Sequence, residues 1–167
     1  DKESLTTIAE YYLRKNYFSD ALTIFSQLAE TDQDSDILFQ KIGYCKQMEG
    51  DLKGALDAYL HADLLNSESK WVIRRIAGCY RSLKQPKEAL KYYHRYEALN
   101  PDNLSVQISI GHCHLELKDY NEALKCFFKV DYLDNKSHKA WRPIAWCSFL
   151  TGKYDQARNY YKKILDN

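Results

Sequence analysis

The stretch that decides the fold is residues 70–103, which reads KWVIRRIAGCYRSLKQPKEALKYYHRYEALNPDN. Its apolar residues recur at helical spacing in two blocks, 70–83 and 86–98. Residues three and four apart lie on one side of an α-helix, so each block predicts an amphipathic helix. Pro86 favours a helix start, because a first-turn N–H has no partner to lose. The stretch is therefore predicted to be a helix–turn–helix unit.

This unit recurs along the whole chain with a period of 34 residues. The period is marked by an alanine column at Ala21, Ala55, Ala89, Ala123 and Ala157. Four residues later come Phe25, Tyr59, Tyr93, Phe127 and Tyr161. Twelve residues before the alanines come Ala9, Gly43, Ala77, Gly111 and Ala145, each preceded by isoleucine. Two helices joined by a short turn approach closely, which explains the small residues, and the aromatic side chain fills the wider part of the gap.

The columns resemble the tetratricopeptide repeat family, whose pattern is W-x₂-L-G-x₂-Y…A-x₃-F…P. The residues that carry the resemblance best are Trp141 and Ile144-Ala145 in the fifth period and Tyr80, Ala89, Tyr93 and Pro101 in the third. The resemblance implies an all-α fold, a right-handed α-solenoid of about five helix-turn-helix repeats. It also implies a concave groove lined by the first helix of each pair. The predicted single repeat domain is 1–167, with repeats at 2–35, 36–69, 70–103, 104–137 and 138–167.

The total charge conceals a gradient along the chain. Lys and Arg number 24 and Asp and Glu number 23, a net charge of +1, which lacks the basic excess of a nucleic-acid binder. Residues 2–35 and 36–69 each carry three positive and six negative charges, whereas 70–103 carry eight positive and three negative. Residues 138–167 carry six positive and two negative. The basic middle and end favour an acidic protein partner.

Neither catalysis nor a bound metal or cofactor finds support in the sequence. The five histidines show no metal-ligand spacing, and no phosphate-binding or nucleophile motif is present. Cys45, Cys79, Cys113 and Cys147 share the 34-residue period. Equivalent positions in packed helices lie ~8–10 Å apart, too far for disulfides, so these cysteines are predicted to be buried thiols. The chain has five cysteines, and their mostly unpaired state favours a reducing compartment such as the cytoplasm. No apolar run reaches the length of a membrane helix.

The first helices carry aromatic and basic residues opposite their predicted buried side. Aromatic residues and arginine are enriched where proteins bind one another. The predicted groove residues are Tyr44, Trp71, Arg74, Arg81, Ile108, His112, Arg142 and Trp146. The competing interpretation is that curvature of the array packs neighbouring first helices over these side chains. Pro143 is expected to kink or delay the first helix of the fifth repeat.

The sequence thus favours a non-enzymatic scaffold that binds a protein or peptide segment. The expected ligand is an extended segment with carboxylates and an apolar anchor. The alternative is a structural spacer or self-assembling repeat module; an RNA-binding repeat protein or an enzyme is less favoured. Repeat arrays need a cap over the last apolar face, yet no polar cap follows Tyr154, Ala157, Tyr161 and Ile164. We therefore expect the sequence to be a fragment of a longer chain, or to self-associate through its C-terminal helix.

Overall fold

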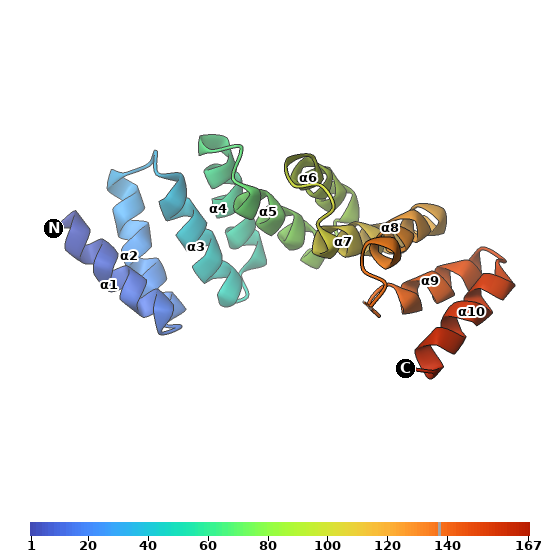
Figure 1. Cartoon of the computed structure of the whole chain (residues 1–167). Helices are drawn as coiled ribbons and strands as arrows, with labels where there is room; N and C mark the ends of the chain where they lie inside the picture. Colours follow the sequence, from blue (N-terminus) through green and yellow to red (C-terminus); the bar gives the residue numbers. More distant parts are fainter. Residues whose placement is uncertain (137) are drawn as a thin grey trace. The chain divides into compact units, whose positions relative to one another are not determined.

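The computed structural model describes residues 1–136 and 138–167, and every regular element in this part of the chain is an α-helix (Figure 1). The helices fall into two compact units, residues 1–85 and residues 86–167. Residue 137, at the predicted end of the fourth repeat, lies outside the described residues. Each unit is described by itself.

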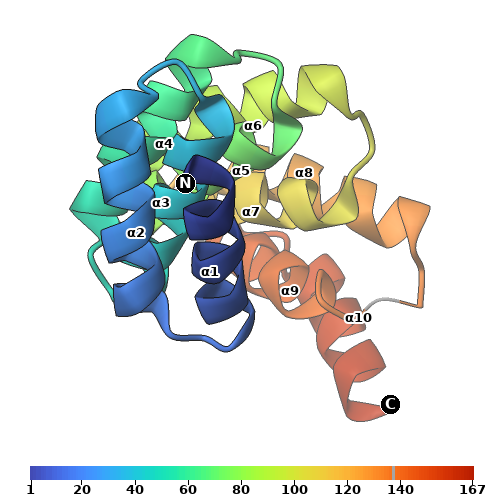
Figure 2. The same cartoon turned by 90° about the vertical axis from the view of Figure 1, so that its left-hand side faces the viewer.

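The first unit contains five consecutive helices, each packed against the next along the chain. They are α1 (Lys2–Arg14), α2 (Phe18–Thr31), α3 (Asp36–Met48), α4 (Leu52–Leu65) and α5 (Lys70–Ser82). Figure 2 looks at this unit from the side of α1 and shows α1 beside α2, with α3 and α4 behind them. The odd-numbered members are the first helices of the predicted repeats, and the even-numbered members are the second helices.

The second unit continues the same alternation. Its helices are α6 (Pro86–Leu99), α7 (Leu104–Glu116), α8 (Tyr120–Leu133), α9 (Trp141–Leu150) and α10 (Tyr154–Leu165). The predicted blocks 70–83 and 86–98 match α5 and α6 within one residue at each end. Pro86 is the first residue of α6, as its fixed backbone angle predicted.

The small-residue column sets how closely two helices of one repeat approach. A Cβ built on Gly43 would lie 2.6 Å from Cε1 of Tyr59, and a Cβ built on Gly111 would lie 2.7 Å from Cζ of Phe127. Both aromatic side chains are fully buried. The glycines therefore let the aromatic ring of the second helix lie directly against the backbone of the first, which is the packing that the sequence columns predicted.

Pro143 delays its helix. The other first helices begin at the first residue of their 34-residue periods, whereas α9 begins three residues into its period, at Trp141. Pro143 is therefore the third residue of α9. The first four N–H groups of a helix have no partner within it, so proline at this position costs no hydrogen bond. The late start follows from the sequence.

The cysteine column is buried, as predicted. Cys45, Cys79, Cys113 and Cys147 are all free thiols with no exposed surface. Burial raises the pKa of the Cys45, Cys79 and Cys147 thiols to about 11. A thiol in this state is a small apolar side chain and a poor nucleophile.

Candidate functional site

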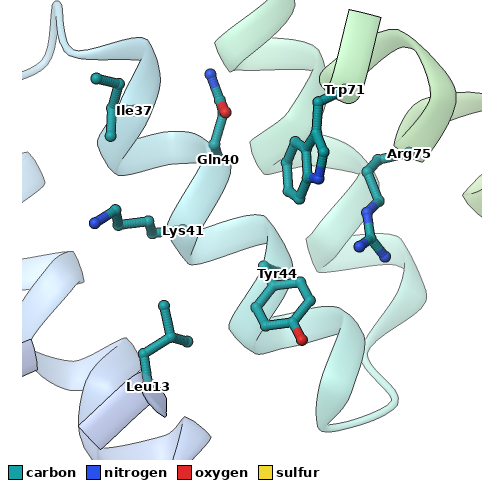
Figure 3. Close-up of a pocket in the computed structure, with 7 residues that line it drawn as sticks. All are labelled: Leu13, Ile37, Gln40, Lys41, Tyr44, Trp71 and Arg75. Carbon is teal, nitrogen blue, oxygen red and sulfur yellow. The ribbon is translucent and has the colours of Figure 1, made fainter. Parts of the chain in front are cut away.

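The first helices of the first unit surround a pocket of about 370 Å³. Leu13 comes from α1, Trp71 and Arg75 come from α5, and the rest of the lining comes from α3 (Figure 3). The α3 residues are Ile37, Gln40, Lys41 and Tyr44. The lining therefore combines aliphatic, aromatic and cationic side chains, which suits a ligand with both apolar and negatively charged groups.

An arginine lies over two aromatic rings on one side of this pocket. The guanidinium carbon of Arg75 is 4.8 Å from the centre of the Trp71 ring and 5.3 Å from that of Tyr44. The two ring centres are themselves 6.5 Å apart. A cation at this distance is attracted to the negative face of an aromatic ring. Arg75 is thereby held at the pocket with its N–H groups available for a further acceptor.

One hydrogen bond holds the arginine on its other side, and a second holds the acceptor of that bond. Nη1 of Arg75 donates to Oε1 of Gln47 at 3.3 Å, and the same oxygen accepts from the hydroxyl of Tyr59 at 2.9 Å. Burial raises the pKa of Tyr59 well above its ordinary value, so its hydroxyl stays a donor at neutral pH. Among the described residues no carboxylate pairs with Arg75. Within the unit its guanidinium therefore contacts neutral groups, the Gln47 amide and two aromatic rings.

The second cation of the pocket already has a partner. Nζ of Lys41 on α3 forms an ion pair with Oε1 of Glu10 on α1 and lies 5.4 Å from the ring centre of Phe25. The hydrogen bond from Lys41 and its positive charge lower the pKa of the Glu10 carboxyl. A negatively charged ligand at Lys41 must therefore compete with Glu10.

Two of the predicted groove residues, Tyr44 and Trp71, line the pocket. Arg74 is exposed and Arg81 is half-buried; both lie on α5 outside the lining. The arginine of the pocket is Arg75, which the sequence places one helical turn after Trp71. That spacing was the available signal, since residues four apart stack on one face.

The remaining predicted groove residues lie in the second unit, on α7 and α9. Ile108 and His112 are half-buried on α7, and the His112 ring packs edge-on against Phe127 at 5.3 Å between centres. Arg142 is exposed on α9. Trp146 is 49% exposed, and its ring stacks with that of Phe149 at 6.0 Å. The role of these four residues in the predicted ligand groove stays a prediction.

The described residues contain no group of three His, Cys, Asp or Glu side chains able to hold a metal ion. Among the same residues, no helix is long and apolar enough to cross a membrane.

Comparison with known proteins agrees with the helix pattern. A family model described as anaphase-promoting complex, cyclosome, subunit 3 matches residues 60–130. A tetratricopeptide repeat model matches residues 144–167. The chain is built of tetratricopeptide repeats. No curated protein sequence matches it significantly.

Solved tetratricopeptide-repeat structures share the fold at low sequence identity. The MamA protein superposes with a TM-score of 0.91 at 17% identity, covering 99% of this chain and 90% of its own. MamA from Desulfovibrio magneticus RS-1 gives a TM-score of 0.90 at 16% identity, with coverage of 99% and 93%. YrrB, a tetratricopeptide-repeat protein with an unusual peptide-binding site, gives 0.88 at 21% identity, with coverage of 99% and 86%. These likenesses show the helix-pair solenoid fold.

Proposed function

We propose that this tetratricopeptide-repeat chain is a non-enzymatic scaffold that binds a peptide or protein segment in the pocket between α1, α3 and α5. The observation that carries the proposal is Arg75, stacked on Trp71 and Tyr44 at the edge of a pocket with aliphatic residues on its other side. Tetratricopeptide repeats serve as protein-interaction scaffolds, and one structural neighbour, YrrB, has an unusual peptide-binding site. Both facts support a peptide ligand.

The ligand class follows from the lining. Arginine binds carboxylates through two parallel N–H···O hydrogen bonds, and the neighbouring rings exclude water from them. Leu13 and Ile37 supply apolar surface for an aliphatic or aromatic anchor. The ligand is therefore an extended segment that carries a carboxylate close to an apolar side chain. In the second unit, Ile108, His112, Arg142 and Trp146 offer a further surface of similar chemistry on α7 and α9.

Loss of one pocket side chain should weaken binding sharply. Short displayed peptides are first selected on the wild-type chain, and the binding of one selected peptide is then measured by calorimetry. We expect Trp71→Ala and Arg75→Ala each to cost about 2 kcal/mol or more of binding free energy. The matched control is Arg74→Ala, because Arg74 is the neighbouring arginine and lies outside the pocket. We expect this substitution to cost less than ~1 kcal/mol of binding free energy. All variants are checked by thermal melts before binding is measured.

Selection of peptides without carboxylates, or equal affinity across the folded variants, would contradict the proposal. A large loss at Arg74 with none at Arg75 would place the binding site at Arg74 instead. If binding is weakened instead by Trp146→Ala, the second unit holds the primary site.

The ion pair at the pocket rim supplies a second prediction. Glu10→Gln removes the carboxylate that occupies Lys41, so an acidic peptide should bind about two- to fivefold more tightly. The matched control is Glu3→Gln, an exposed residue of the same helix. An unchanged affinity in the Glu10 variant, measured by the same calorimetry, would show that Lys41 takes no part in binding.

The same pair gives a weak pH dependence. Because the pKa of Glu10 is lowered in the folded chain, its pairing stabilises the fold above the ordinary pKa of glutamate and is lost as the pH falls through the lowered value. Glu10 is 46% exposed, so solvent screening keeps this contribution below ~1 kcal/mol. Urea unfolding of wild type and Glu10→Gln should therefore differ slightly at pH 7 and converge in acid.

A further inference from the structure

One side-chain amide of the pocket is held in place by a chain of hydrogen bonds behind it. The chain starts between α4 and α5, where the backbone N–H of Glu68 donates to Oδ1 of Asn66 at 3.3 Å. Nδ2 of Asn66 then donates to Oδ2 of Asp36 at 3.0 Å, and the same carboxylate oxygen accepts from Nε2 of Gln40 at 3.1 Å. Asp36 is the first residue of α3, and Gln40 lies one helical turn later, in the lining of the pocket.

The partners in this chain determine which end of the Gln40 amide is free. An ionised carboxylate only accepts hydrogen bonds, so the Gln40 atom next to Asp36 must be the nitrogen. Within the part of the chain that the structure describes, the carbonyl oxygen Oε1 accepts no hydrogen bond. Figure 3 shows this oxygen on the side of Gln40 that faces Trp71. The pocket therefore contains an acceptor that the protein holds in place and leaves open to a ligand.

Most other polar groups of the lining need the opposite kind of partner. Lys41, Arg75 and the indole of Trp71 only donate hydrogen bonds, and the hydroxyl of Tyr44 can donate or accept. A ligand with acceptors alone would cover the Gln40 oxygen without pairing it, which costs free energy. An extended peptide carries a main-chain N–H on each residue other than proline, at intervals of ~3.3 Å, so it supplies donors along its whole length.

We infer that Oε1 of Gln40 accepts a main-chain N–H of the bound segment, and that Asp36 holds the amide in the orientation that this bond requires. The inference rests on the function proposed above, because it needs a peptide in the pocket. Gln40 and Arg75 lie on either side of the Trp71 ring in Figure 3. The main chain of the ligand therefore crosses this ring, with its N–H at Gln40 and its carboxylate at Arg75.

Peptides with a single ester bond test this hydrogen bond. The parent is an acidic peptide selected on the wild-type chain, and each analogue replaces one main-chain amide with an ester, which removes one N–H and keeps every side chain. Binding to wild type and to Gln40→Met is measured by calorimetry. On wild type we expect one analogue to bind about fivefold more weakly than the parent. On Gln40→Met the parent should itself bind about fivefold more weakly, and that same ester should cause no further loss.

The substitution keeps the length of the side chain and removes only its amide. Gln40 is half-buried, and thermal melts establish that the variant folds. The matched control is Gln33→Met, because Gln33 is exposed and lies outside the pocket. This variant should bind the parent and every ester as the wild type does.

The results with Gln40→Met and Arg75→Ala separate this inference from the proposed function. If Arg75→Ala weakens binding while every ester has the same effect on wild type and on Gln40→Met, the inference is overturned and the proposed function stands. Equal binding of the parent peptide to wild type and to Gln40→Met would also overturn it. If one ester depends on Gln40 while Arg75→Ala has no effect, the hydrogen bond is upheld and the carboxylate site at Arg75 is contradicted.

Discussion

Replacing Gly43 with valine is expected to lower the free energy of unfolding by about 3 kcal/mol or more, because it over-packs a buried contact. The first added atom alone would lie 2.6 Å from Cε1 of Tyr59, closer than real Cβ contacts. The ring has little freedom to move, since it is fully buried and its hydroxyl donates to Gln47 at 2.9 Å. Relief requires α3 and α4 to separate. The measurement is equilibrium unfolding in urea.

The matched control is the same substitution at Gly78. It also lies inside a first helix, α5. Apart from its chain neighbours and the nearby backbone of its own helix, no atom of the described residues lies within 4 Å of a Cβ built there. Glycine and valine differ by only a few tenths of a kcal/mol in helix propensity, so Gly78→Val should change stability by less than ~0.5 kcal/mol. Equal losses at both glycines would mean that valine acts through helix propensity, and the packing argument for the small-residue column would be wrong.

This contrast shows what the sequence can predict. The small residue at Gly43 and the aromatic at Tyr59 belong to columns that recur five times, and each column reflects packing inside one helix pair. The helix pairs, the turns that join them and the burial of the cysteines can all be predicted from packing within one repeat. The late start of α9 follows as well, because proline acts on its own backbone.

The pocket was only partly predictable, because it depends on three helices at once. Helical projection placed Tyr44 and Trp71 on the exposed side of their helices, and both line the pocket. It could not choose between Arg74 and Arg75, since neighbouring residues on a helix differ by 100° and long side chains reach across that angle. Leu13 enters from a different repeat. Its role depends on the approach of α1 to α3, which no pattern within one repeat specifies.

Removing the carboxylate of Asp131 is expected to destabilise the second unit by about 2–4 kcal/mol, because two hydrogen bonds to a charged acceptor are lost. Nε1 of Trp141 on α9 donates to Oδ1 at 2.8 Å, and the hydroxyl of Tyr160 on α10 donates to Oδ2 at 2.6 Å. Asp131 on α8 therefore ties together the last three helices. Trp141 is only 7% exposed, so Asp131→Ala leaves its N–H buried without a partner.

Hydrogen exchange gives this prediction a local readout. Amides of α9 and α10 should exchange faster in Asp131→Ala, because these helices are held to α8 through the lost bonds, while those of α1–α4 should keep their wild-type rates. Asp131→Asn keeps an acceptor for one of the two donors and should lose about half as much stability. The control is Asp155→Ala, whose carboxylate is 91% exposed and pairs with Arg158 on the same helix, with an expected loss below ~0.5 kcal/mol. If Asp131→Ala cost no more than this control, the carboxylate would be a solvated surface group, and the docking of α9 and α10 would rest on apolar packing alone.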